Sequence, residues 1–183
     1  FSITISPAER QPILPEIILV QAIPKLDRMD YIIQKAVEIG ARRIVPVFSE
    51  RTIVQLDSRG INSRVKRWEK IAVESSKQCG RADFLKIEQP GQYREVIKKE
   101  LSQKGIGILG CIAEKTVYLR EALSQSKEDR YVIIVGPEGD FTQSEIEYAL
   151  GYGAKPASLG KRILRTDTAA IFMMAAIMYQ YGK

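Results

Sequence analysis

The sequence contains no histidine and only two cysteines, Cys79 and Cys111, in 183 residues. The two cysteines lie far apart and outside any metal-ligand spacing, so we expect no zinc or other metal site. The absence of histidine also excludes the Ser-His and Cys-His pairs of nucleophilic catalysis. Any chemistry must therefore depend on carboxylates, arginines, backbone groups or a reactive cofactor.

Long apolar runs and targeting signals are missing as well. No apolar stretch reaches the ~18 residues of a membrane span, and the alternating N-terminal residues 1–5 have no signal-peptide pattern. We interpret both cysteines as small apolar residues in a reducing compartment. These observations predict a cytoplasmic protein without a membrane partner.

Acidic residues are the scarcer charged type. The chain has 28 Lys and Arg against 22 Asp and Glu, a net charge of +6, and a pI of about 9.3. This balance favours an anionic partner, with nucleic acid first. Many basic proteins bind no nucleic acid, and no aromatic-rich RNA-binding signature is present, so composition alone leaves the partner open.

Apolar runs alternate with helical patterns along most of the chain. The apolar runs predict buried strands at 17–22, 44–48, 84–87, 106–110 and 131–135. Helical spacing predicts helices at 28–39, 62–78, 93–103, 117–126 and from 166 or 167 to 181. A capping box at 142–145 begins one more helix, and Pro46 suggests a strand end or a sheet edge. The alternation predicts an α/β fold with a mainly parallel sheet flanked by helices.

A glycine-containing loop follows the predicted strand 131–135. It reads Gly136-Pro137-Glu138-Gly139-Asp140-Phe141, and its glycines let the backbone approach a ligand closely. It has neither the Gly-Lys-Ser/Thr of a phosphate-binding loop nor a dinucleotide fingerprint. The loop alone fits either a tight strand-to-helix turn or a ligand site at the carboxyl end of a parallel strand.

A second loop, 159–168, also leads from a strand into a helix. It contains three cations within five residues: Lys161, Arg162 and Arg165. Their repulsion gives a purely structural loop little advantage, whereas a loop that faces phosphate or an anionic base gains from it. Thr166 or Asp167 is also a candidate cap for the last helix.

Basic residues elsewhere are candidates for RNA contacts. The predicted helix 62–78 has a basic face formed by Arg64, Lys66, Arg67 and Lys70. Gly80 is a plausible helix stop that frees Arg81 to project from a loop. Arg81 is then either a solvated surface group or a functional one.

The two loops, taken together, closely resemble the RsmE family, SPOUT-class methyltransferases that modify N3 of a uridine in bacterial small-subunit ribosomal RNA. Further landmarks of the resemblance occur in order at 25–30, 34–40, 67–68 and 78–81. The chain differs from the family pattern at two positions. It has Asp140 where the family usually has a second glycine, and Asp167 where it usually has glutamate.

The resemblance implies a C-terminal trefoil knot, bound S-adenosylmethionine and a homodimer through the knot region. It divides the chain into residues 1–15, a remnant of or linker from an N-terminal RNA-binding β-barrel, and a methyltransferase domain at 16–183. Expected cofactor contacts are Leu109, Gly110, Cys111, Gly136, Glu138, Gly139, Leu159, Gly160, Ile163, Leu164 and Thr168. Expected catalytic residues are Arg165, Arg162, Arg81 and Glu138, and expected RNA contacts are Arg64, Arg67 and Lys161.

The expected reaction is direct methyl transfer to uridine N3 in 16S ribosomal RNA on the small ribosomal subunit. Cations would stabilise the anionic uracil, and Glu138 or Asp167 would accept the N3 proton. Two other functions stay open. One is methylation of another RNA such as tRNA, and the other is a non-catalytic RNA-binding assembly protein.

Overall fold

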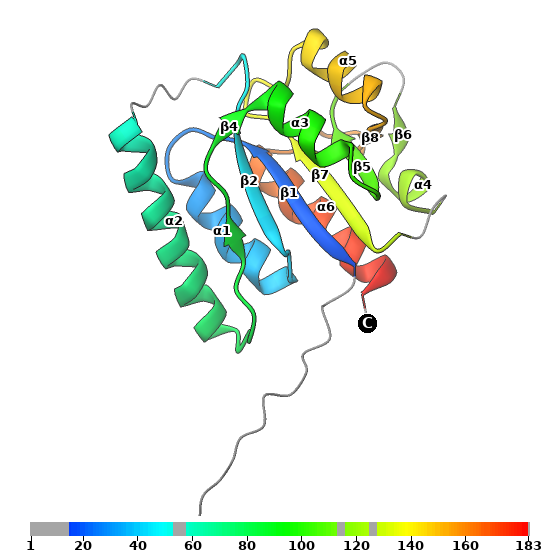
Figure 1. Ribbon diagram of the computed structural model, residues 1–183. Coiled ribbons are helices and arrows are strands. Elements are labelled where there is room, and N and C mark those ends of the chain that lie inside the picture. The colour runs from blue at the N-terminus through cyan, green and yellow to red at the C-terminus, as the bar shows by residue number, and fades with distance from the viewer. Residues whose placement is uncertain (1–14, 53–57, 113–115, 125–127, 183) are drawn as a thin grey trace, which may run out of the picture.

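The computed structural model describes residues 15–52, 58–112, 116–124 and 128–182 (Figure 1). Its strands are β1 (Glu16–Ala22), β2 (Arg43–Phe48), β3 (Lys86–Ile87), β4 (Gly91–Gln92), β5 (Ile106–Gly110), β6 (Val117–Tyr118), β7 (Arg130–Val135) and β8 (Lys155–Ser158). Its helices are α1 (Arg28–Ile39), α2 (Ser58–Gln78), α3 (Tyr93–Leu101), α4 (Leu119–Ser124), α5 (Gln143–Gly151) and α6 (Thr166–Tyr181). Residues 1–14, nearly all of the predicted N-terminal remnant or linker, lie outside the described ranges.

The strands form one sheet in the order β3-β2-β1-β7-β5-β8-β6. The short strand β4 pairs with β2 on the same side as β3, farther along β2. Every pairing is parallel. The predicted α/β class with a mainly parallel sheet is therefore confirmed. The trefoil knot stays a prediction.

Helices cover both faces of the sheet (Figure 1). Odd-numbered residues of β1, such as Ile17 and Leu19, pack in one apolar cluster with α1, α2, α4 and α6. Even-numbered residues, such as Ile18 and Val20, pack in a second cluster with α3 and α5. Because both faces are buried, the central strands are continuously apolar, which is what the sequence showed. None of the described helices is long and apolar enough to cross a membrane.

A buried ion cluster fastens α3 to the sheet. Glu100 of α3 has a fully buried side chain, and its carboxylate accepts hydrogen bonds from Arg43 of β2 at 2.9 and 2.7 Å. It also accepts one from Arg130 of β7 at 2.7 Å. Pairing with two guanidinium groups compensates the desolvation of the carboxylate.

Differences from the sequence prediction include two that concern β6 and β2. Residues 117–126 do not form one helix, because 117–118 pair with β8 as β6 before α4 begins at Leu119. Pro46 marks neither a strand end nor an edge, because it pairs with Gln21 inside β2. The carbonyl of Ile44 accepts from the amide of Glu88, so even-numbered residues of β2 face β3 and β4. Pro46 therefore falls in the gap between those two short strands, where no amide donor is needed.

Candidate functional site

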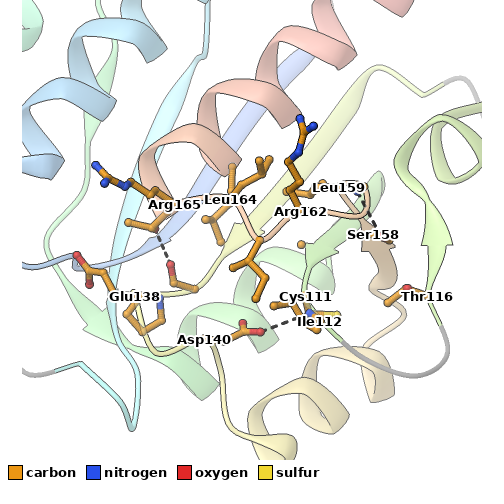
Figure 2. Close-up of a pocket in the computed structure, with 18 of the residues that line it drawn as sticks. Cys111, Ile112, Thr116, Glu138, Asp140, Ser158, Leu159, Arg162, Leu164 and Arg165 are labelled. Atoms are coloured by element: carbon orange, nitrogen blue, oxygen red, sulfur yellow. Dashed lines mark hydrogen bonds between the residues drawn. The ribbon is translucent and has the colours of Figure 1, made fainter.

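A cavity of about 430 Å³ lies at the carboxyl ends of the three adjacent strands β7, β5 and β8. The loops that follow these strands form its walls (Figure 2). Figure 2 shows Arg162 and Arg165 on one side of the pocket and Cys111, Ile112 and Asp140 across from them. Its lining residues are Arg28, Gly110, Cys111, Ile112, Thr116, Val135, Gly136, Pro137, Glu138, Asp140, Ser158, Leu159, Gly160, Lys161, Arg162, Ile163, Leu164, Arg165, Thr166 and Ala169.

Two of the lining residues are glycines at which a side chain would collide with the protein itself. A Cβ added to Gly110 would lie 2.9 Å from the sulfur of Met173. A Cβ added to Gly136 would lie 3.1 Å from a carboxylate oxygen of Asp140 and 3.3 Å from its Cα. These close approaches explain the glycines at the ends of β5 and β7.

A buried chain of hydrogen bonds (the relay) joins the loop after β7 to the start of α6. The hydroxyl of Thr166 donates to the carbonyl of Gly136 at 2.6 Å, and it accepts from the side-chain amide of Gln21 at 2.9 Å. Gln21 is fully buried in β1. Its side-chain oxygen has no hydrogen-bond partner among the described residues. The sequence prediction that Thr166 or Asp167 caps α6 is wrong, because the N-cap is Arg165 and it makes no side-chain cap.

Glu138 points toward the β1–α1 loop. Its carboxylate accepts from the backbone amide of Lys25 at 3.1 and 3.3 Å and lies 3.3 Å from Nε of Arg28. Nη1 of the same guanidinium lies 3.4 Å from a carboxylate oxygen of Asp167. One arginine thus pairs with an acidic residue from each of the two loops that the sequence singled out.

Asp140 adopts a left-handed backbone conformation with a φ of 60°. Glycine adopts this conformation without strain, so the glycine that the family resemblance leads one to expect here would fit it. The aspartate compensates with its side chain, which accepts from the amide of Phe141 at 2.8 Å and from that of Ile112 at 3.4 Å. The second bond ties the β7 loop to the β5 loop across the pocket (Figure 2).

Three cationic side chains at the pocket have no ion partner among the described residues. Lys161, Arg162 and Arg165 line the cavity and are exposed. None of the three makes a side-chain hydrogen bond or salt bridge with the described part of the chain. Their positive charge is therefore available to a ligand.

Cys111 lines the same cavity as a neutral thiol. Burial, together with the nearby charge of Asp140, raises its pKa to about 11. The thiol is consequently protonated at neutral pH, which agrees with its interpretation as a small apolar residue.

Most of the expected site residues come together in this cavity, but several do not. Leu109 is fully buried beneath it, and Gly139 and Thr168 are exposed outside its lining. Gly139 instead offers its carbonyl to Arg51, whose Nη1 lies 2.7 Å away.

The prediction that Arg81 projects freely from a loop is wrong, and Arg81 does not line the cavity. Gly80 does end the helix region in a left-handed conformation, with a φ of 70°. However, only 6% of the Arg81 side chain is exposed, because it binds Asp83 at 2.7 and 3.0 Å and the carbonyl of Val37 at 3.1 Å. Val37 belongs to the last turn of α1, which precedes β2. Arg81 therefore lies at the end of the sheet where the parallel strands begin (the amino edge), opposite the cavity.

The expected RNA contacts on α2 differ in environment. Arg64 is partly buried, whereas Arg67 pairs with Asp27 at 3.3 Å and with Asp30. Arg67 thus fastens α2 to the start of α1. Neither residue lines the cavity.

Sequence reasoning missed several lining residues. Ile112, Thr116 and Ser158 follow or end strands, and extending each predicted loop by a few positions would have included them. Arg28 and Gln21 carried no local signal, because the residues that they bind at the site are 110 to 145 positions away in the sequence.

The strain at Asp140 predicts a difference between two variants. Asp140→Gly and Asp140→Ala both lose the carboxylate, but only glycine relaxes at positive φ. We expect Asp140→Gly to be more stable than Asp140→Ala by about 1 kcal/mol. Urea unfolding measures both free energies, and equal stability would contradict the strain at this residue.

The relay predicts that the hydroxyl of residue 166 matters more than its methyl group. Thr166→Val has nearly the same shape but removes the hydroxyl that donates to the carbonyl of Gly136 and accepts one hydrogen bond from the side-chain amide of Gln21. We therefore expect a loss of about 1–3 kcal/mol in unfolding free energy. Thr166→Ser keeps the hydroxyl and should cost less than ~1 kcal/mol. A valine variant as stable as the serine variant would rule out the relay as a stabilising feature.

The chain is similar to known RNA-modifying proteins. The model of the RNA methyltransferase domain matches residues 10–178. Ribosomal RNA small subunit methyltransferase E of Buchnera aphidicola is 32% identical over 170 residues, 88% of this chain and 62% of that protein. The Bacillus subtilis protein of the same name is 28% identical over 177 residues, 90% of this chain and 66% of that protein. The chain therefore spans about two thirds or less of the length of these two relatives.

Solved structures share the fold. Ribosomal RNA small subunit methyltransferase E from Neisseria gonorrhoeae, bound to S-adenosyl methionine, superposes with a TM-score of 0.82 and 35% identity over 91% of this chain and 67% of that one. A putative methyltransferase from Legionella pneumophila with bound cofactor gives a TM-score of 0.85 and 31% identity over 94% and 68% of the two chains. The resemblance drawn from the two loops is confirmed, and the chain belongs to the RNA methyltransferase domain family and, within it, to the RsmE family of SPOUT-class proteins.

Proposed function

We propose that this protein transfers a methyl group from S-adenosylmethionine to N3 of a uridine in 16S ribosomal RNA of the small subunit. The observation that carries the proposal is a cavity partly lined by glycines on which three cations, Lys161, Arg162 and Arg165, have no ion partner within the described ranges. Family membership supports the reaction class, and the names of the relatives support the substrate.

The residues of the cavity fit this cofactor. Its volume of about 430 Å³ lies within the range of small-molecule sites. The glycines at 110 and 136 let backbone groups approach a ligand, and Leu159 and Leu164 offer apolar surface for an adenine ring. The carboxylate of Asp140 is complementary to a cationic ligand. When bound, the cofactor supplies an electrophilic methyl group, which explains why the protein needs no nucleophile of its own.

The protein must orient the uracil and stabilise it after N3 loses its proton. The nearby Arg162 and Arg165 would bind the anionic base, whose negative charge is shared with its carbonyl oxygens. Glu138 and Asp167 were the candidate proton acceptors. Both pair with Arg28, so we assign the cationic role to the two arginines. The N3 proton, which must leave before N3 attacks the methyl group, then passes to solvent water rather than to either carboxylate.

The RNA would reach the pocket with its target base splayed from its neighbours, as enzymes that modify bases require. Lys161 at the rim and Arg64 on α2 remain our candidates for phosphate contacts. Arg81 has no place in the proposal, because it is held at the opposite edge of the sheet.

We also propose a homodimer formed through the C-terminal region. This part of the chain exposes large apolar side chains: Ile163 is 82% exposed, Phe172 46% and Tyr179 91%. Exposed apolar residues gathered in one region are typical of a protein interface.

Light scattering should therefore report twice the chain mass of 20.6 kDa. Phe172→Asp should reduce the measured mass to that of one chain, because a carboxylate is costly to bury in an apolar interface. Phe84→Asp, at an exposed apolar residue near the amino edge of the sheet, serves as the control and should leave the dimer intact. A monomeric wild-type protein would refute the dimer.

The methylation reaction can be tested on small ribosomal subunits from a strain that lacks the family enzyme. We expect the protein to bind S-adenosylmethionine in calorimetry and to methylate one uridine at N3, identified by mass spectrometry of the nucleosides. Arg165→Ala should lower kcat by about 10²–10³-fold and leave cofactor affinity nearly unchanged. Arg42→Ala, at an exposed arginine of the amino edge, is the matched control.

Other outcomes separate the alternatives. Cofactor binding with transfer to tRNA alone would indicate a different RNA substrate. Absence of cofactor binding would indicate a non-catalytic RNA-binding protein. Full activity of Arg165→Ala would refute the role given to that arginine.

A further inference from the structure

We propose that Arg28 is a positioning residue that joins the two pocket loops and, by pairing with their carboxylates, keeps Arg162 and Arg165 available to the substrate. The inference rests on the proposed methyl transfer and assigns a role within that same site. It concerns a residue for which the sequence pattern gave no function.

The contacts of Arg28 place it between the two loops. It is the first residue of α1 and lines the cavity. Its Nε lies 3.3 Å from Glu138 in the loop after β7, and its Nη1 lies 3.4 Å from Asp167 in the first turn of α6. Only 29% of its side chain is exposed, against 28% and 20% for its two partners. A single planar guanidinium therefore links segments that are 29 positions apart in the sequence.

The segment that carries Arg28 is itself fixed. Leu26 has a φ of 56°, a conformation that is unfavourable for a leucine. The backbone amide of Lys25 binds Glu138, and Asp27 and Asp30 pair with Arg67 of α2. These contacts hold the start of α1 on two sides, so that Arg28 extends from an anchored backbone rather than from a free loop.

By pairing with Glu138 and Asp167, Arg28 keeps these carboxylates from competing for the cations of the site. Asp167 stands two residues after Arg165, and Glu138 lines the same cavity as the free cations. Without Arg28, the two carboxylates would lose their cationic partner, and the side chains of Arg162 and Arg165 at the same site would attract them. The arginines would then pair with protein carboxylates and lose the orientation needed for an anionic base. Arg28 removes this competition.

The test compares charge removal with charge restoration. We expect Arg28→Met to lower kcat on small subunits by about 10²-fold. Both loops would shift, and the freed carboxylates would pair with the catalytic arginines. The triple variant Arg28→Met/Glu138→Gln/Asp167→Asn removes the two carboxylates as well and should recover activity by about tenfold relative to Arg28→Met. Rescue by further mutation is expected for charge competition and not for simple loss of structure.

Arg28→Lys provides the conservative variant. An ammonium group keeps the charge but lacks the planar fork that reaches two carboxylates, so we expect activity between those of Arg28→Met and the wild type. Urea unfolding of each variant verifies that it is folded. If Arg28→Met is unfolded, Arg28→Lys and the double variant Glu138→Gln/Asp167→Asn still test the idea. Arg28→Lys with wild-type kcat, or a triple variant no better than Arg28→Met, would overturn it.

Cofactor calorimetry separates this inference from the proposed reaction. If the wild-type protein binds S-adenosylmethionine but methylates no subunit, the proposed reaction fails. The linkage of the two loops by Arg28, the clamp, is then tested by cofactor affinity. We expect Arg28→Met to weaken cofactor binding about tenfold, because the loops are no longer joined. The triple variant should restore part of this affinity. Unchanged affinity in Arg28→Met would reject the clamp in that case.

Discussion

The hydrogen bond from Thr166 to the carbonyl of Gly136 is the constraint on which the site depends. It fixes the beginning of α6 against the end of β7, and so sets how the loop between β8 and α6 passes over the sheet. Gln21 supports it from β1, the strand beside β7. Because the relay is buried, its geometry is protected from water, and each member would be costly to leave unpaired. The cavity owes its shape to this fixed crossing of backbone segments.

The distribution of charge around the cavity follows a consistent pattern. Its acidic groups are engaged by the protein: Glu138 and Asp167 pair with Arg28, and Asp140 accepts two backbone amides. The cations of the second loop, in contrast, have no protein partner in the described ranges. The local field is therefore positive at the rim, which suits a polyanionic substrate.

Periodicity was sufficient to predict the class of fold. Continuous apolar runs identified the buried central strands, and glycines at strand ends identified two of the loops that build the cavity. Long-range contacts were not predictable in the same way. Arg28 meets Asp167 across 139 positions and Gln21 meets Thr166 across 145, and no local pattern announces such a pair. Arg81 shows the converse error: the helix stop at Gly80 left a functional loop arginine open, yet a neighbouring aspartate and a helix carbonyl bind it away from the site.

The lack of histidine is consistent with the chemistry proposed for this cavity. A group that must both accept and donate protons near neutral pH is needed when the protein supplies the nucleophile or the leaving-group acid. In the proposed reaction the methyl donor arrives already activated, and the acceptor is a weakly acidic nitrogen whose anion needs cations nearby. Arginines keep their charge at any physiological pH. A site composed of arginines, glycine backbone and paired carboxylates meets these requirements, and the lone thiol in the cavity, neutral because burial raises its pKa, takes no part.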